Sequence, residues 1–132
     1  MQTFLPLPCF QQSVQCLDWR RLGKQRVEAY QIRNVLTSND PKAAWRNHPA
    51  VQMWYGYENA LGQYLDCCIV EWVRRGYNNK MELTNLTGPL PLWFGNNCIH
   101  ESHRSNLLRK DETYYRQFGW TEPTNLPYVW PV

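Results

Sequence analysis

Apolar residues recur every three or four positions over most of the chain, which predicts helices rather than strands. The first ten residues contain two prolines and predict an extended arm. A short helical turn is expected over residues 10–17, followed by a helix over residues 19–36 with Asp18 as its N-cap. The apolar positions of that helix are Leu22, Ala29, Ile32 and Leu36.

The strongest helical pattern follows a break at residues 37–41, where four turn-forming residues precede a proline. Pro49 suits the first position of a helix, and apolar side chains then recur at helical spacing as far as Trp72. Arg74 and Arg75 suit the last turn, and Gly76 suits the position after it. The pattern predicts one helix over residues 49–75, roughly 40 Å long.

The remainder of the chain is expected to be irregular with one further helix. Residues 77–97 are rich in Asn, Gly and Pro, a helix is predicted over 99–109, and a turn over 112–117 is closed by Gly119. Residues 121–132 contain three prolines and should be extended. The expected fold is therefore all-α: a single compact domain over residues 1–132 with about three main helices, a long irregular segment and extended termini.

Composition narrows the class of protein. A chain of 132 residues with 43% apolar and 19% charged residues is not a disordered tail, and its 7 Trp and 8 Tyr exceed what a small core holds. Five cysteines without a C-x-x-C motif predict neither a disulfide framework nor a zinc site. With no secretory signal or membrane-spanning run, we expect a soluble cytoplasmic monomer with no metal, no other cofactor and no membrane partner.

The net charge of +3 is modest, but the cations are clustered. Four of them lie within residues 20–26, a stretch that contains no acidic residue: Arg20, Arg21, Lys24 and Arg26. One interpretation is a set of groups that grips phosphates, since guanidinium groups bind phosphate oxygens in pairs. The other is a solvated basic face with Asp18 or Glu28 as its neighbours.

Two further polar clusters are suited to binding a nucleic acid. Residues 99–110 include His, Arg, Ser and Asn, side chains that donate hydrogen bonds to phosphates and bases. They lack the H-E-x-x-H spacing of a metal site. Residues 45–49 lead into a predicted helix, where His48 could contact an anion or simply cap the helix. The candidate DNA-binding residues are Arg20, Arg21, Lys24, Arg26, Arg46, His48, His103, Arg104, Asn106, Arg109 and Lys110.

These motifs resemble the pyrimidine-dimer DNA glycosylases of the bacteriophage endonuclease V type, and especially their compact bacterial and phage relatives. The matching segments are residues 18–28, 45–49, 102–111, 114, 118–120 and 127–131, which together span nearly the whole chain. The resemblance implies a DNA repair glycosylase and abasic-site lyase that acts on damaged or modified pyrimidines in double-stranded DNA. It also implies that an N-terminal amine forms a Schiff base with the sugar, that a helical glutamate assists, and that no metal is needed.

The resemblance also indicates which residues would carry the chemistry. The second residue is bulky, so Met1 should be retained and its α-amine is the first candidate nucleophile, with Lys24 the second. In an ungapped alignment the catalytic glutamate falls on Gly23, and Glu28 lies five positions further, about 140° around the helix. Glu28 and Asp18 are therefore the acid/base candidates.

Two other functions stay open from the sequence. One is a catalytically inactive module that binds a nucleic acid or nucleotide on the same fold. The other is a helical protein-interaction or structural protein, which should have negligible affinity for DNA even at low salt.

Overall fold

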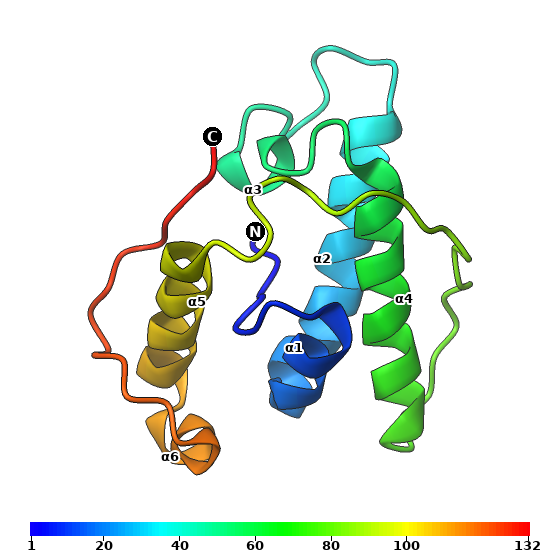
Figure 1. Cartoon of the computed structure of the whole chain (residues 1–132). Coiled ribbons are helices and arrows are strands. Elements are labelled where there is room, and N and C mark those ends of the chain that lie inside the picture. Colours follow the sequence, from blue (N-terminus) through cyan, green and yellow to red (C-terminus); the bar gives the residue numbers. More distant parts are fainter.

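Three long helices dominate the structure, a computed structural model that describes residues 1–132 (Figure 1). The chain contains no strand, so the all-α prediction is confirmed. The elements are α1 (Phe10–Cys16), α2 (Trp19–Thr37), α3 (Pro49–Gln52), α4 (Glu58–Arg74), α5 (Asn97–Lys110), α6 (Glu112–Tyr115) and a 3-10 turn, η1 (Arg116–Phe118). None of these helices combines the length and apolar character needed to cross a bilayer.

The single helix predicted over residues 49–75 is wrong, because the chain turns between α3 and α4. Gly56 has φ = +83°, a left-handed conformation that glycine adopts at little cost and that no α-helix contains. The turn places Trp54 in the core, where its indole N–H donates to the Thr3 hydroxyl at 3.0 Å. This contact with a distant part of the chain is not visible in local hydrophobic spacing.

The other predicted elements agree with the structure within two residues. The helix predicted over 99–109 is α5, residues 75–96 are irregular, and Gly119 ends η1 with φ = +72°. Asp18 is the N-cap of α2, as predicted, although its side chain makes no capping hydrogen bond.

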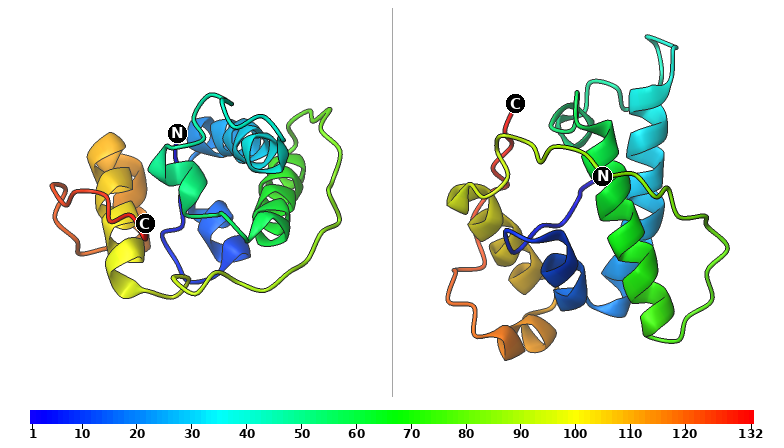
Figure 2. Two further views of the ribbon diagram at one scale, coloured as in Figure 1. Left: turned by 90° about the horizontal axis from the view of Figure 1, so that it is seen from above. Right: turned by 45° about the vertical axis from the view of Figure 1, so that its right-hand side comes forward.

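The N-terminal arm, residues 1–9, runs between α5 on one side and the helices α1, α2 and α4 on the other (Figures 1 and 2). Residues 2–6 of the arm are buried. Helices α2 and α4 pack against each other in antiparallel orientation, and α3 lies close to the start of the arm (Figure 2). An extended chain therefore passes through the core, so its backbone polar groups need partners there.

Gln25 of α2 supplies several of these partners. Its side-chain oxygen accepts the N–H of Phe4 at 2.8 Å and the hydroxyl of Tyr64 at 2.7 Å, and its Nε2 donates to the carbonyl of Gln2 at 2.8 Å. The Tyr64 hydroxyl lies 2.9 Å from the carbonyl of Phe4. Gln25 is only 1% exposed, so α2 and α4 are joined to the arm by a buried amide.

Candidate active site

A cleft of about 740 Å³ lies where the start of the arm meets α2, the end of α5 and the C-terminal segment. It brings together six of the residues predicted from the sequence with five others. The predicted residues are Met1, Arg20, Arg21, Lys24, Glu28 and Lys110, and the additional ones are Gln2, Phe4, Trp19, Gln25 and Tyr128.

Glu28 lies directly beside the first residues of the chain. Its Oε2 accepts the backbone N–H of Gln2 at 3.2 Å and the side-chain N–H of Gln25 at 3.3 Å. Gln25 therefore contacts both the backbone next to Met1 and the carboxylate on α2. The result is a carboxylate held one residue from an α-amine, at the edge of an open cleft.

Gly23, where the ungapped alignment puts the catalytic glutamate, faces away from this cleft. A Cβ atom added at Gly23 would lie 3.1 Å from the ring of Trp72 on α4. Five residues of α-helix turn the side chain by about 140°, so Glu28 projects toward the arm while Gly23 projects toward α4. The rotation of about 140° between positions 23 and 28 of α2 is therefore what brings the Glu28 carboxylate to the arm.

Positive charge gathers around Glu28. The pKa of Lys110 is lowered mainly by partial burial of its ammonium group, and further by the positive charges of Arg21, Arg109 and Lys24. The negative charge of Glu28 raises this pKa. These cations come from α2 and from the last turn of α5, so two helices that are far apart in the sequence form one electropositive surface. A polyanion would be attracted to it.

Aromatic rings line the same cleft. Trp19 is 54% exposed, and the guanidinium of Arg20 lies 5.4 Å from the centre of its ring. Tyr128, from the C-terminal segment, has its pKa raised mainly by burial, and Arg109 and Arg21 oppose this shift. The exposed Trp19 ring beside cations is suited to a nucleotide, since an aromatic ring stacks on a base and cations bind phosphates.

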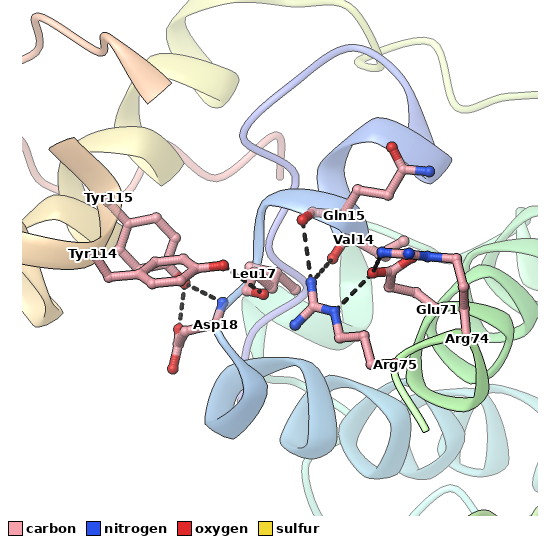
Figure 3. A network of polar contacts seen from close by, with 9 residues as sticks. All are labelled: Val14, Gln15, Leu17, Asp18, Glu71, Arg74, Arg75, Tyr114 and Tyr115. Atoms are coloured by element: carbon pink, nitrogen blue, oxygen red, sulfur yellow. Dashed lines mark hydrogen bonds and ion pairs between the residues drawn. The ribbon is translucent and has the colours of Figure 1, made fainter. Parts of the chain in front are cut away.

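Asp18, the second acid/base candidate, is placed elsewhere. It is 6% exposed and accepts a hydrogen bond from Arg21. It also accepts a hydrogen bond from the Tyr115 hydroxyl and donates its own N–H to the Tyr115 oxygen (Figure 3). Burial, together with this contact, raises the pKa of Tyr115. Asp18 thus joins α2 to α6 and does not line the cleft.

The same close-up shows how α1 is joined to α4. Glu71 accepts hydrogen bonds from Arg74 and Arg75 at 2.6–2.7 Å, and Arg75 donates to the carbonyls of Val14 and Gln15 at the end of α1 (Figure 3). These contacts join the end of α4 to the end of α1, and none of their residues lines the cleft.

The histidines and Arg104 of α5 hold the arm and do not line the cleft. The ring of His103 is fully buried and its Nδ1 accepts the N–H of Leu5 at 2.9 Å. Nδ1 of His100 lies 2.7 Å from the carbonyl oxygen of Leu5, and Arg104 donates to the carbonyl of Pro6 at 2.7 Å. Their side chains therefore position the arm that leads to Met1.

Asn106 has a comparable role toward the C-terminal segment. Its amide donates to the carbonyls of Ser102 and Leu126, at 2.7 and 3.1 Å, and its oxygen accepts from Arg109. The side chain is fully buried.

Three other predicted DNA-binding residues also lie outside the cleft. Arg26 stacks on the Trp72 ring at 4.7 Å and bonds to Asn79, while Arg46 donates to three backbone carbonyls around the end of α2. His48 caps α3 by accepting the Ala50 N–H at 3.0 Å. Burial, and next the positive charge of the N-terminal amine, lower the pKa of His48.

Sequence reasoning missed five residues of the cleft, and helical spacing could have found one of them, Gln25. Positions 21, 24, 25 and 28 recur at three or four residues, so Arg21, Lys24, Gln25 and Glu28 share one face of α2. The others are Gln2, Phe4, Trp19 and Tyr128, of which Gln2, Phe4 and Tyr128 reach the cleft through the paths of the arm and the C-terminal segment.

The site of this helical protein is therefore a cleft in which an amine lies near a carboxylate, on a surface lined by cations and aromatic rings that suits a nucleic acid. The sequence model of a family described as pyrimidine dimer DNA glycosylase matches residues 1–85. The chain belongs to this family, and membership implies that it binds DNA. No protein with a curated description and no solved structure matches the chain.

Proposed function

We propose that the protein is a DNA glycosylase and abasic-site lyase acting on damaged or modified pyrimidines in double-stranded DNA. The observation that carries the proposal is the contact of Glu28 with the backbone of residue 2, inside a cleft lined by cations. Membership of the glycosylase family supports the same reaction class. We propose further that the protein works in the cytoplasm as a monomer and without a metal; the five free cysteines suit a reducing compartment.

In this proposal the Met1 α-amine is the nucleophile and Glu28 is the acid/base. An unprotonated α-amine has a lone pair that can attack C1′ of the sugar. The C1′–N bond breaks, the base leaves with the bonding electrons, and it takes up a proton. O4′ then departs from C1′ with a proton, which leaves an iminium group between the amine and the opened sugar.

The lyase step continues from the iminium group. Removal of a proton from C2′ expels the 3′ phosphate from C3′, and water then hydrolyses the C=N bond to free the amine. In this proposal Glu28 would carry the protons that move in these steps, which its contact with the backbone of the residue after the amine supports.

The phosphates would be held by the four cations that line the cleft: Arg20, Arg21, Lys24 and Lys110. Four such contacts predict that the logarithm of affinity falls with the logarithm of salt concentration with a slope of about −3.6. The other predicted DNA-binding residues do not line the cleft and bond within the protein, so they are left out of this set: Arg26, Arg46, His48, His103, Arg104, Asn106 and Arg109.

Borohydride trapping on DNA with an abasic site tests the chemistry, because the reagent reduces the iminium group to a stable amine. We expect a covalent adduct, and peptide mass spectrometry should locate it on Met1. An adduct on Lys24 or Lys110 would keep the lyase and overturn the nucleophile. No adduct with the wild-type protein would overturn the lyase itself.

A pair of matched variants tests Glu28. Glu28→Gln keeps the side chain's size but removes the charge, and we expect the cleavage rate of UV-irradiated DNA to fall about 10²–10⁴-fold. Glu101→Gln is the control, since Glu101 lies on α5 and bonds only to Asn97. Equal rates for the two variants would remove Glu28 from the mechanism.

The second candidate function is a catalytically inactive binding module on the same fold. The cation-lined cleft favours it as much as it favours the enzyme. Retention of DNA in a gel shift, with no cleavage of UV-irradiated DNA and no trapped adduct, would support the module.

A further inference from the structure

The C-terminal segment supplies part of the wall of the cleft. This segment runs along α5 (Figure 1), where the Val129 N–H donates to the Ser102 hydroxyl at 3.2 Å. Its path brings Tyr128 to the cleft, and the end of α5 brings Lys110 to it. The other cations of the cleft and its carboxylate come from α2. The cleft therefore has one wall from α2 and another from the C-terminal part of the chain.

The ring of Tyr128 is held by three aromatic neighbours. Its centre lies 6.4 Å from that of Phe4, 6.0 Å from that of His103 and 5.6 Å from that of Trp130. Phe4 and His103 are buried, and both belong to the contacts that position the arm. The protein core therefore sets where the Tyr128 hydroxyl lies, and a donor fixed in advance loses little freedom when it binds a partner.

The hydroxyl of Tyr128 differs from those of the other tyrosines that pack in the interior. The hydroxyls of Tyr64, Tyr114 and Tyr115 each donate to an oxygen of the protein, whereas that of Tyr128 donates to none. A buried tyrosine hydroxyl normally has such a partner. Burial also raises the pKa of Tyr128, so the hydroxyl keeps its proton at neutral pH. Tyr128 therefore brings an unused hydrogen-bond donor to the wall of the cleft.

A donor at this place suits one event in the proposed reaction. In the lyase step the C3′–O bond breaks, and negative charge increases on the 3′ phosphate. The 5′ phosphate keeps its charge throughout. A donor accelerates a reaction only where it binds the transition state more strongly than the ground state, so the 3′ phosphate is the group on which it can act. Tyrosine hydroxyls are among the groups that donate to phosphate oxygens.

We propose that Tyr128 is a further catalytic residue, whose hydroxyl donates a hydrogen bond to the 3′ phosphate as this group leaves C3′. The inference rests on the proposed function. Glu28 takes the proton from C2′, the C–H electrons form the C2′=C3′ double bond, and the phosphate departs with the electron pair of the C3′–O bond. Tyr128 keeps its proton and stabilises the charge on the departing oxygens, beside the cation of Lys110.

Reactions on DNA that already contains an abasic site test this role. With the protein in excess over the DNA, borohydride trapping measures the formation of the iminium group, and strand cleavage measures the elimination that follows. Tyr128→Phe keeps the aromatic contacts and removes only the hydroxyl. We expect trapping at the wild-type rate and strand cleavage slowed about 10- to 100-fold, the usual effect of losing one hydrogen bond to a charged group.

Tyr114→Phe is the matched control. Tyr114 is also half-buried, but its hydroxyl donates to the Leu17 carbonyl at 3.4 Å and it does not line the cleft. This variant should trap and cleave at the wild-type rates.

Two results for Tyr128→Phe would overturn the inference alone: cleavage at the wild-type rate, or trapping slowed as much as cleavage. In both cases the wild-type protein still forms its adduct. Failure of the proposed function is distinguishable, because the wild-type protein would then form no adduct, which would overturn the proposed function and this inference together.

Discussion

Acid should destabilise this protein through His103, the buried histidine that holds the arm. Its Nδ1 accepts the Leu5 N–H, so the proton of the neutral ring is on Nε2 and a second proton would displace this bond. Burial, and next the charge of nearby His100, lower the pKa of His103 from 6.5 to about 3. The folded protein therefore keeps a neutral ring in a range of pH where the unfolded chain takes up a proton.

The magnitude follows from this difference in pKa. Above pH ~6.5 both states are neutral and the stability is complete; below it the unfolded state binds the extra proton, so the free energy of unfolding falls with pH. With a pKa of 6.5 in the unfolded chain and about 3 in the folded protein, the free energy of unfolding falls by about 5 kcal/mol in total. This full loss is reached below pH ~3. At pH ~5 the loss should be about 2 kcal/mol.

Urea unfolding followed by circular dichroism at pH ~7.5 and pH ~5 measures this loss. His103→Asn is the informative variant, because an amide oxygen can accept the Leu5 N–H but does not titrate. It should lower stability at pH ~7.5 and remove about 2 kcal/mol of the pH dependence. The reasoning is refuted if the wild-type protein and the variant lose the same free energy between the two conditions.

Three further substitutions have defined outcomes. Gln25→Leu leaves the Phe4 N–H and the Gln2 carbonyl without their buried partner, so the free energy of unfolding should fall by about 3 kcal/mol, measured by urea unfolding, and trapping should weaken. Gly23→Glu should cost about 1–2 kcal/mol through crowding against Trp72, and should not restore cleavage when combined with Glu28→Gln. Trp45→Gly should be about 1 kcal/mol more stable in thermal unfolding than Trp45→Ala, since glycine tolerates the positive φ. A carboxylate at position 23 that restored activity, or a Gly variant no more stable than Ala, would contradict these assignments.

Local sequence signals were sufficient for much of the fold. The bounds of α2 and α5 and the left-handed residue at Gly119 follow from apolar spacing and turn chemistry, which act within a few residues. The same spacing failed between α3 and α4. There the turn at Gly56 is stabilised by a contact between Trp54 and Thr3, and no local window contains both residues.

The candidate site was likewise determined in part by local sequence and in part by tertiary structure. The order of residues alone determined that cations cluster on the first half of α2 and that Glu28 projects about 140° from Gly23, because helix geometry is local. Only the tertiary structure decided that the arm passes beside Glu28, since its path depends on buried hydrogen bonds from Gln25 and His103. The same residue types form buried hydrogen bonds and bind DNA, so only the packing of the chain shows which of the two a given polar side chain does.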